Sequence, residues 1–168
     1  MLFRSDPEAG RQAYLKSHIP GARYVHLDED MSAPVSDATG RHPLPDIETL
    51  TRKLCAWGVG VNRQVVVYDD SYGAMAVRLW WMLRWLGHPA VALLDGGFPK
   101  WRKEQRPLTT EVPVPHKANC ACLPENSLIA DVEDVLRASR TGDALILDAR
   151  ARGRSEEHTS ELQSPYVI

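Results

Sequence analysis

The hydrophobic pattern of the chain is densest in its middle third. Residues 65–67 are three consecutive valines, which is typical of a strand buried on both faces of a parallel sheet. Residues 74–86 are apolar on nearly every side, which predicts a buried helix that Gly87 ends. Residues 91–94 predict a second buried strand. This order predicts a βαβ unit whose connecting loop, residues 69–73, lies at the carboxyl edge of the sheet, where open α/β folds place their chemistry.

Weaker patterns predict the remaining elements. Three helices preceded by a capping aspartate are expected at residues 7–16, 47–57 and 132–139, after Asp6, Asp46 and Asp131. Three further strands are expected from short apolar runs at Ala22–His26, Leu128–Ala130 and Ala144–Asp148.

Composition changes this picture little. The chain has 168 residues, of which 43% are hydrophobic and 25% charged, as in an ordinary globular domain. The formal net charge of −2 gives no indication of nucleic acid or an anionic membrane as a partner. Neither an apolar run of transmembrane length nor a signal-peptide pattern is present. We therefore expect a cytoplasmic protein that binds neither nucleic acid nor membranes.

The cysteines suggest no special chemistry. Cys55, Cys120 and Cys122 are too few and too unevenly spaced for a disulfide scaffold, so a reduced protein is expected. Cys55 lies beside the apolar face of its helix and is interpreted as a small hydrophobic residue. The Cys-x-Cys pair has no second pair at metal-binding spacing, so no metal site is predicted.

Two polar residues invite a functional interpretation. His18 could be a ligand or a base, but its place in a Pro-Gly turn favours a structural hydrogen-bonding role. Arg78 lies among tryptophans in the central helix and could bind an anion. We expect it instead to satisfy a carboxylate or to stack on an indole.

Four motifs follow one another in a fixed order: HIPGARYVHLD at residues 18–28, GRHPLP at 40–45, YDDSYGAMAVRLWWMLRWLGH at 68–88 and ALLDGGFPKW at 92–101. Together they resemble the first domain of two-domain sulfurtransferases of the rhodanese type. The resemblance implies an α/β rhodanese-like domain with a small parallel sheet flanked by helices. It also implies that this chain lacks the first strand of that sheet.

In that family the loop after the strand carries a cysteine, and backbone N–H groups with a helix N-terminus favour its thiolate and persulfide. Asp69 stands at the matching position. The resemblance therefore implies a silent copy of the loop, made of Asp69, Asp70, Ser71, Tyr72 and Gly73. The working cysteine would lie in a second domain. It would move sulfane sulfur from thiosulfate or 3-mercaptopyruvate to a thiophilic acceptor, without metal or organic cofactor.

The resemblance also divides the chain. Residues 1–101 are expected to form the truncated, non-catalytic domain, residues 102–126 an interdomain linker, and residues 127–153 the start of the second rhodanese-like domain. Residues 154–168 begin with a run similar to a translated sequencing adapter and are expected to be an artefactual, disordered tail. Arg154, six residues after Asp148, matches an arginine that binds the donor's anionic group in the family.

The sequence leaves one alternative function open and excludes two others. A non-catalytic rhodanese-like module used for binding or regulation stays open, since Asp69 is the evidence for it. A Cys-x5-Arg phosphatase is excluded because the residues six positions after the three cysteines are Val61, Asn126 and Leu128. A haloacid-dehalogenase-like site is excluded because Ser71 stands where an acid is needed. Finally, Ala144–Asp148 is expected to pair with the sheet in place of the missing strand.

Overall fold

The computed structural model describes residues 7–114, 116–120 and 122–148. The chain divides into two compact units, with the boundary between Asn126 and Ser127. Each unit is described by itself.

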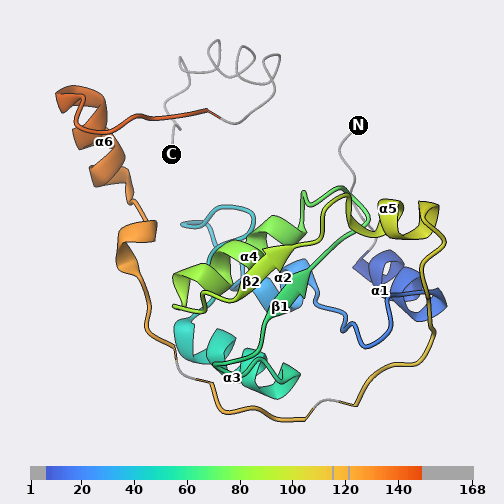
Figure 1. Cartoon of the computed structure of the whole chain (residues 1–168). Helices are drawn as coiled ribbons and strands as arrows, with labels where there is room; N and C mark the ends of the chain where they lie inside the picture. Colours follow the sequence, from blue (N-terminus) through green and yellow to red (C-terminus); the bar gives the residue numbers. More distant parts are fainter. Residues whose placement is uncertain (1–6, 115, 121, 149–168) are drawn as a thin grey trace. The chain divides into compact units, whose positions relative to one another are not determined.

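The first unit is built on two parallel strands, β1 (Val65–Val67) and β2 (Val91–Leu93), whose three residues pair in register. The helix α4 (Ala76–Trp85) connects them and packs against both (Figure 1). The βαβ order predicted from the sequence is thus confirmed, but the prediction that both strands are buried is wrong, since Val66 and Leu93 are 53% and 39% exposed. Because the two strands are parallel, the loop after β1 and the loop after β2 meet at one edge of the sheet.

Four more helices complete this unit, namely α1 (Pro7–Lys16), α2 (Leu27–Met31), α3 (Ile47–Trp57) and α5 (Gly97–Lys103). The capping predicted for α3 is confirmed, because the Asp46 carboxylate accepts the N–H of Thr49 at 2.9 Å. Gly58 ends α3 in the left-handed conformation with a φ of 84°. Helix α2 was not predicted, since its cap is the ring of His26, which accepts the N–H groups of Asp28 and Glu29.

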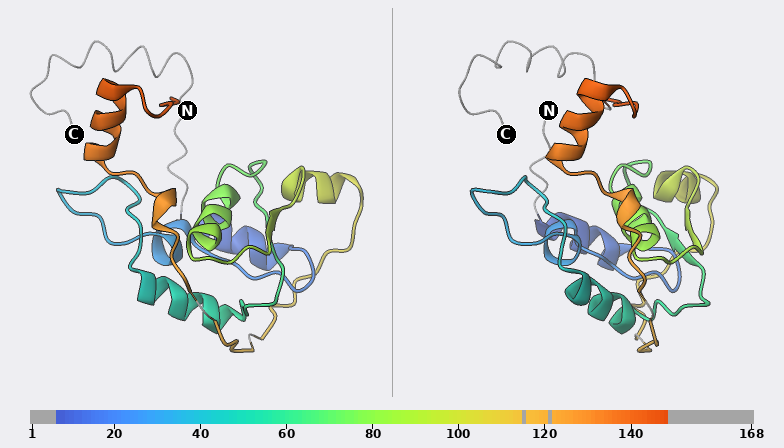
Figure 2. Two further views of the ribbon diagram at one scale, coloured as in Figure 1. Left: turned by 60° about the vertical axis from the view of Figure 1, so that its left-hand side comes forward. Right: turned by 90° about the vertical axis from the view of Figure 1, so that its left-hand side faces the viewer.

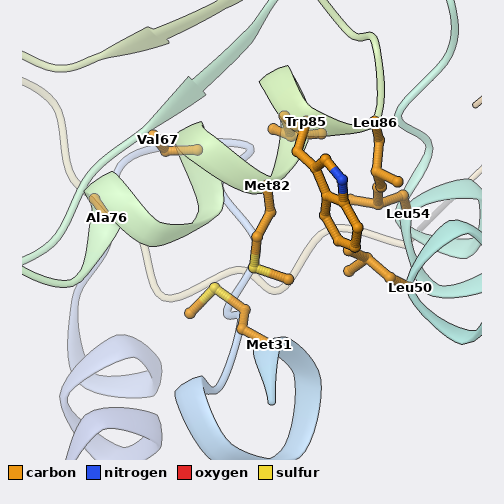
Figure 3. Packing of buried hydrophobic residues seen from close by; sticks show 9 residues of the cluster. Met31, Leu50, Leu54, Val67, Ala76, Met82, Trp85 and Leu86 are labelled. Carbon is orange, nitrogen blue, oxygen red and sulfur yellow. The ribbon is translucent and has the colours of Figure 1, made fainter. Parts of the chain in front are cut away.

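The core lies between α3, α4 and the sheet. Its most buried members are Leu50 of α3 with Met82 and Leu83 of α4, all at 0% exposure. In Figure 3 the thioethers of Met31 and Met82 point toward one another, and Leu50 and Leu54 lie beside the indole of Trp85. Alternating flexible and branched side chains of this kind fill the space below a short sheet.

The segment predicted as a linker belongs to the first unit. Thr109 forms an antiparallel bridge with His18, and both of its backbone hydrogen bonds are 2.9 Å long. Further along, the N–H groups of Ala118, Leu123 and Glu125 donate to carbonyls at the C-terminal ends of α3 and α4. We call residues 116–120 and 122–125 the strap; Figure 2 shows it running past the end of α3.

The described part of the second unit, residues 127–148, contains one helix, α6 (Val132–Thr141), with a short 3-10 turn (η1, Asn126–Leu128) at its boundary. The predicted cap is confirmed, because Asp131 and Asp134 form a reciprocal capping box. Gly142 ends the helix with a φ of 71°.

Three strand predictions are wrong. Residues 22–26, 128–130 and 144–148 form no strand, and the sheet of the described residues contains only β1 and β2. The pairing expected for Ala144–Asp148 is therefore wrong as well, and Leu145 and Leu147 are 83% and 78% exposed. Short apolar runs become strands only when a neighbouring edge accepts them, and near residue 22 the backbone is held instead by the Tyr14 hydroxyl, which donates to the Ala22 carbonyl.

Candidate functional site

The candidate site is the loop that joins β1 to α4, residues 68–75, at the carboxyl edge of the sheet. The backbone of Asp69 is fixed from the neighbouring loop, since its carbonyl accepts the N–H of Phe98 at 2.9 Å. Gly97 makes this approach possible: a Cβ there would lie 2.8 Å from the Asp69 carbonyl oxygen, and its φ is 56°. Gly97 thus lets the loop after β2 hold the loop after β1 in place.

The carboxylate of Asp69 is the centre of the loop. Its Oδ1 accepts the N–H groups of Ser71 and Gly73, each at 2.8 Å. Its Oδ2 accepts those of Met75 at 2.7 Å and Ala76 at 2.8 Å, at the N-terminus of α4. Four convergent N–H donors and a helix N-terminus make an anion cradle, and the side chain of the loop itself fills it.

The protonation state of Asp69 follows from these contacts. Partial burial raises the pKa of the carboxyl, but the hydrogen bonds from Ala76, Gly73, Ser71 and Met75 outweigh it, and the net pKa lies below its ordinary value. Asp69 is therefore an anion at neutral pH, and the positive end of the α4 dipole faces a negative charge.

Most of the other loop residues are exposed, namely Asp70, Ser71, Tyr72, Ala74 and Met75. Asp70 lies 3.7 Å from the guanidinium of Arg102, and both side chains are exposed. Tyr72 is 79% exposed and adopts a φ of 57°, which is unusual for a residue with a side chain. The loop that the sequence predicted to be silent is thus ordered around the Asp69 carboxylate, which fills the anion cradle. A carboxylate in this position can hold an N–H cradle together, but it cannot carry a sulfur atom.

His18 has the structural role expected of it. It is 1% exposed, its Nδ1 lies 2.7 Å from the Tyr14 carbonyl oxygen, and its Nε2 lies 3.0 Å from that of Glu111. The ring also stacks on Tyr14. These contacts join the end of α1 to the segment after α5 and leave no face of the ring for a substrate.

Arg78 is structural too, but with other partners than those expected. Its Nε and Nη2 donate to the Met31 carbonyl at 3.1 and 2.9 Å, and Nη2 also contacts the carbonyls of His42 and Pro43. The prediction of a carboxylate or indole partner is wrong, because the end of α2 offers orphan carbonyl groups that need donors.

The cysteines lie away from the loop of Asp69. Cys55 of α3 and Cys120 of the strap form a disulfide with a Cα–Cα distance of 5.5 Å, so the expectation of a wholly reduced chain is wrong. Cys122 is free, and its sulfur accepts the Thr51 hydroxyl at 3.0 Å. The sequence did not reveal this pairing, because the two half-cystines are separated by 65 positions along the chain.

The other described parts of the chain that could carry a function offer no second candidate site. Arg154, the expected anion-binding residue, lies outside the described residues, as does the tail beyond it. A depression of about 540 Å³ between α2 and the start of α3 is lined by four acidic residues, Asp28, Glu29, Asp30 and Asp46, and by two basic ones, Arg41 and Lys53. The excess of acidic residues gives it no preference for an anionic sulfur donor. In the part of the chain that the structure describes, we find no cluster of His, Cys, Asp or Glu suited to a metal ion. No helix within that same part is long and apolar enough to cross a membrane.

Comparison with known proteins places these features in context. Residues 4–104 match the model of the rhodanese-like domain. A "Probable 3-mercaptopyruvate sulfurtransferase" of Pseudomonas aeruginosa is 42% identical over 89% of this chain and 53% of its own length. The thiosulfate sulfurtransferase of Bos taurus is 34% identical, over 86% of this chain and 48% of its own. The chain thus spans about half the length of these curated relatives.

A solved structure also matches the fold of this chain. The crystal structure of SseA from Escherichia coli, a 3-mercaptopyruvate sulfotransferase with the rhodanese fold, matches 94% of this chain and 59% of its own. The TM-score is 0.78 and the sequence identity 31%.

Proposed function

The chain belongs to the rhodanese-like domain family, and we propose that it supplies the first, non-catalytic domain of a two-domain sulfurtransferase. The intact protein would carry its reactive cysteine in a second rhodanese-like domain, which residues 127–153 would open. The thiolate would attack the sulfane sulfur of thiosulfate or 3-mercaptopyruvate and release sulfite or pyruvate. The resulting persulfide would pass its terminal sulfur to a thiophilic acceptor such as cyanide. The proposed setting is the cytoplasm.

One observation carries the proposal for this domain, namely that the carboxylate of Asp69 accepts all four N–H groups of the cradle. A thiolate or persulfide would need those same donors. Since Asp69 is ionised at neutral pH, a second anion in the cradle would meet both steric exclusion and charge repulsion. The loop therefore supports the fold of its domain and leaves the transfer of sulfur to the other domain.

The test is a sulfur-transfer assay on the purified 168-residue chain. We expect no thiocyanate from thiosulfate and cyanide, and no pyruvate from 3-mercaptopyruvate, above the rate in buffer. The relative from Pseudomonas aeruginosa serves as a full-length comparison. Turnover that disappears on changing Cys55, Cys120 or Cys122 to serine would contradict the proposal. We also expect Asp69→Cys to restore little activity, because the groups that bind the donor would lie in the second domain.

The second candidate function is a rhodanese-like module that binds or regulates without catalysis. The self-filled cradle of Asp69 suits it equally well, because such a module needs the fold and not the nucleophile. The uninterrupted genomic reading frame distinguishes the two. A second loop with a cysteine downstream of Asp148 supports the sulfurtransferase, whereas its absence from the whole protein supports the binding module.

A further inference from the structure

All three cysteines of the chain meet at one place in the first unit. The disulfide joins Cys55 near the end of α3 to Cys120 in the strap. Their Cα–Cα distance of 5.5 Å lies within the normal range for a disulfide. Cys122 is held nearby by Thr51, which precedes Cys55 by one helical turn on α3. Cys120 and Cys122 also line the same small depression, together with Leu54 and Val59.

The strap lies close against the first unit on both sides of these cysteines. The N–H of Ala118 donates to the Cys55 carbonyl at 3.0 Å, and that of Leu123 donates to Leu86 at 3.1 Å. Two glycines permit this approach: a Cβ on Gly58 would lie 2.8 Å from the His116 carbonyl oxygen, and one on Gly87 would lie 2.7 Å from that of Leu123. The strap is thus seated in a complementary surface, and the disulfide closes it covalently.

We propose that Cys55, Cys120 and Cys122 form a thiol–disulfide exchange site that latches the strap onto α3. Its co-substrates are dithiol reductants and disulfide oxidants, whether small molecules or proteins. The site is separate from the Asp69 loop and does not depend on the proposed sulfur transfer. A disulfide beside a free third thiol has the components that exchange requires, namely a bond that can be attacked and a nucleophile that can attack it.

Two reactions follow from this arrangement. In reduction, a thiolate of an external dithiol attacks a sulfur of the Cys55–Cys120 bond, and the second thiol resolves the mixed disulfide. Cys55 and Cys120 gain two electrons and two protons, and the dithiol becomes a disulfide. In exchange, the thiolate of Cys122 attacks the sulfur of Cys55. A Cys55–Cys122 bond forms, Cys120 leaves as a thiolate and takes up the proton that Cys122 lost, and no net oxidation occurs.

The two reactions have different consequences for the strap. Exchange moves the bonded strap residue from Cys120 to Cys122 and keeps the latch closed. Reduction opens the latch and leaves the strap attached by backbone hydrogen bonds alone. After reduction, the chain between Cys120 and Ser127, the first residue of the second unit, is held to the first unit by the hydrogen bonds from the N–H groups of Leu123 and Glu125.

The site is tested by mapping thiols in the full chain after incubation with glutathione disulfide or with dithiothreitol. Samples are quenched with N-ethylmaleimide and digested with trypsin, which releases residues 54–63 and 118–137 as separate peptides. In the oxidised sample we expect these peptides joined by one disulfide and carrying one maleimide. In the reduced sample we expect them separate with three maleimides. Three maleimides after oxidation would overturn the proposal.

Variants separate the latch from the exchange. Cys122→Ser is the matched control and should keep the Cys55–Cys120 link. Cys120→Ser should still join the two peptides, now through Cys122, and an unlinked Cys120→Ser chain would overturn the exchange step. Amide exchange at Ala118 and Leu123 should be at least tenfold faster in the reduced wild-type chain than in the oxidised one, and equal rates would overturn the latch.

Discussion

At the scale of single residues, Asp69 does for the fold what a capping residue usually does next to a helix. Helix α4 begins after Met75, whose side chain makes no cap. Asp69 supplies the missing acceptor from six residues earlier and binds the N–H groups of Met75 and Ala76. The residue that fills the anion cradle is therefore also the residue that caps the helix.

Replacement of Asp69 by asparagine should destabilise the first unit. The asparagine side chain offers one acceptor oxygen to four donors, and its NH₂ group would face two N–H groups. From the usual strength of hydrogen bonds to charged groups, we expect the free energy of unfolding at pH 7 to fall by about 1.5–3 kcal/mol. Urea denaturation followed by tryptophan fluorescence measures this.

The contribution of Asp69 to the free energy of unfolding should depend on pH. The folded-state pKa of Asp69 is depressed, so its contribution is fully present above the unfolded-state value of about 3.9 and is lost as pH falls through the folded value. The difference between wild type and Asp69→Asn should therefore shrink below about pH 4. Asp70→Asn, at an exposed ion pair, should cost less than about 1 kcal/mol at either pH. Equal losses for the two variants at pH 7 would contradict the role of Asp69.

At the scale of elements, Arg78 ties α4 to the end of α2 and to the loop before α3. Its guanidinium fork reaches the carbonyls of Met31, His42 and Pro43, and burial lowers the pKa of Arg78 without discharging it. We expect Arg78→Met to lower the free energy of unfolding by about 1.5–3 kcal/mol, because it removes the donors to the Met31 and His42 carbonyls, whereas the Pro43 carbonyl still accepts the N–H of Ala33.

Two further variants sharpen the test of Arg78. Arg78→Lys should lower the free energy of unfolding by less than Arg78→Met does, because its ammonium group still donates to a carbonyl. Some loss should remain, because an ammonium group lacks the planar fork. Arg84→Met, on an exposed position of the same helix, should cost less than about 1 kcal/mol. Chemical denaturation of the three variants in parallel decides the matter, and a loss for Arg84→Met as large as that for Arg78→Met would refute the specific role of Arg78.

The elements also show where sequence reasoning succeeds. The βαβ unit and the capped helices were predictable because their signals are local: three valines, the aspartates before α3 and α6, and glycines at helix ends. The strands expected at 22–26, 128–130 and 144–148 were not correct, because a strand exists only with a partner. Helix α2 was missed because histidine is not a common cap, and the Cys55–Cys120 bond because contact across 65 residues leaves no local trace.

For the candidate site, the sequence predicted the position of the central residue but not its hydrogen-bond partners. The family resemblance placed Asp69 at the nucleophile position, and the structure supplies what no pattern contains, namely which four N–H groups its oxygens accept. The partners of Arg78 could not be predicted because backbone carbonyls carry no sequence signature.

At the scale of the whole molecule, the two units differ in what holds them. The apolar core of Met31, Leu50, Leu54, Val67, Ala76, Met82, Leu83, Trp85 and Leu86 lies entirely in the first unit. In the described part of the second unit only Ala138 is buried among the apolar residues, and Val132, Val135 and Leu136 of α6 are 60%, 42% and 49% exposed. Among the described residues, the folding free energy from apolar burial is thus concentrated before residue 127.

Removal of residues 127–168 should therefore leave the first unit nearly as stable as before. A ten-residue helix such as α6 is marginal in water even with a capping box, so its own contribution is small. We expect the free energy of unfolding of a chain ending at Asn126 to lie within about 1 kcal/mol of the full-length value. In the full chain, the amides of α6 should open with a free energy below about 2 kcal/mol, whereas those of Met82 and Leu83 should approach the global value. Hydrogen exchange with mass spectrometry measures the stability of the truncated chain and the opening of the amides in the full chain. Either of two outcomes would show that the second unit shares the stability of the first. One is a loss above about 3 kcal/mol on truncation, and the other is protection of α6 equal to that of α4.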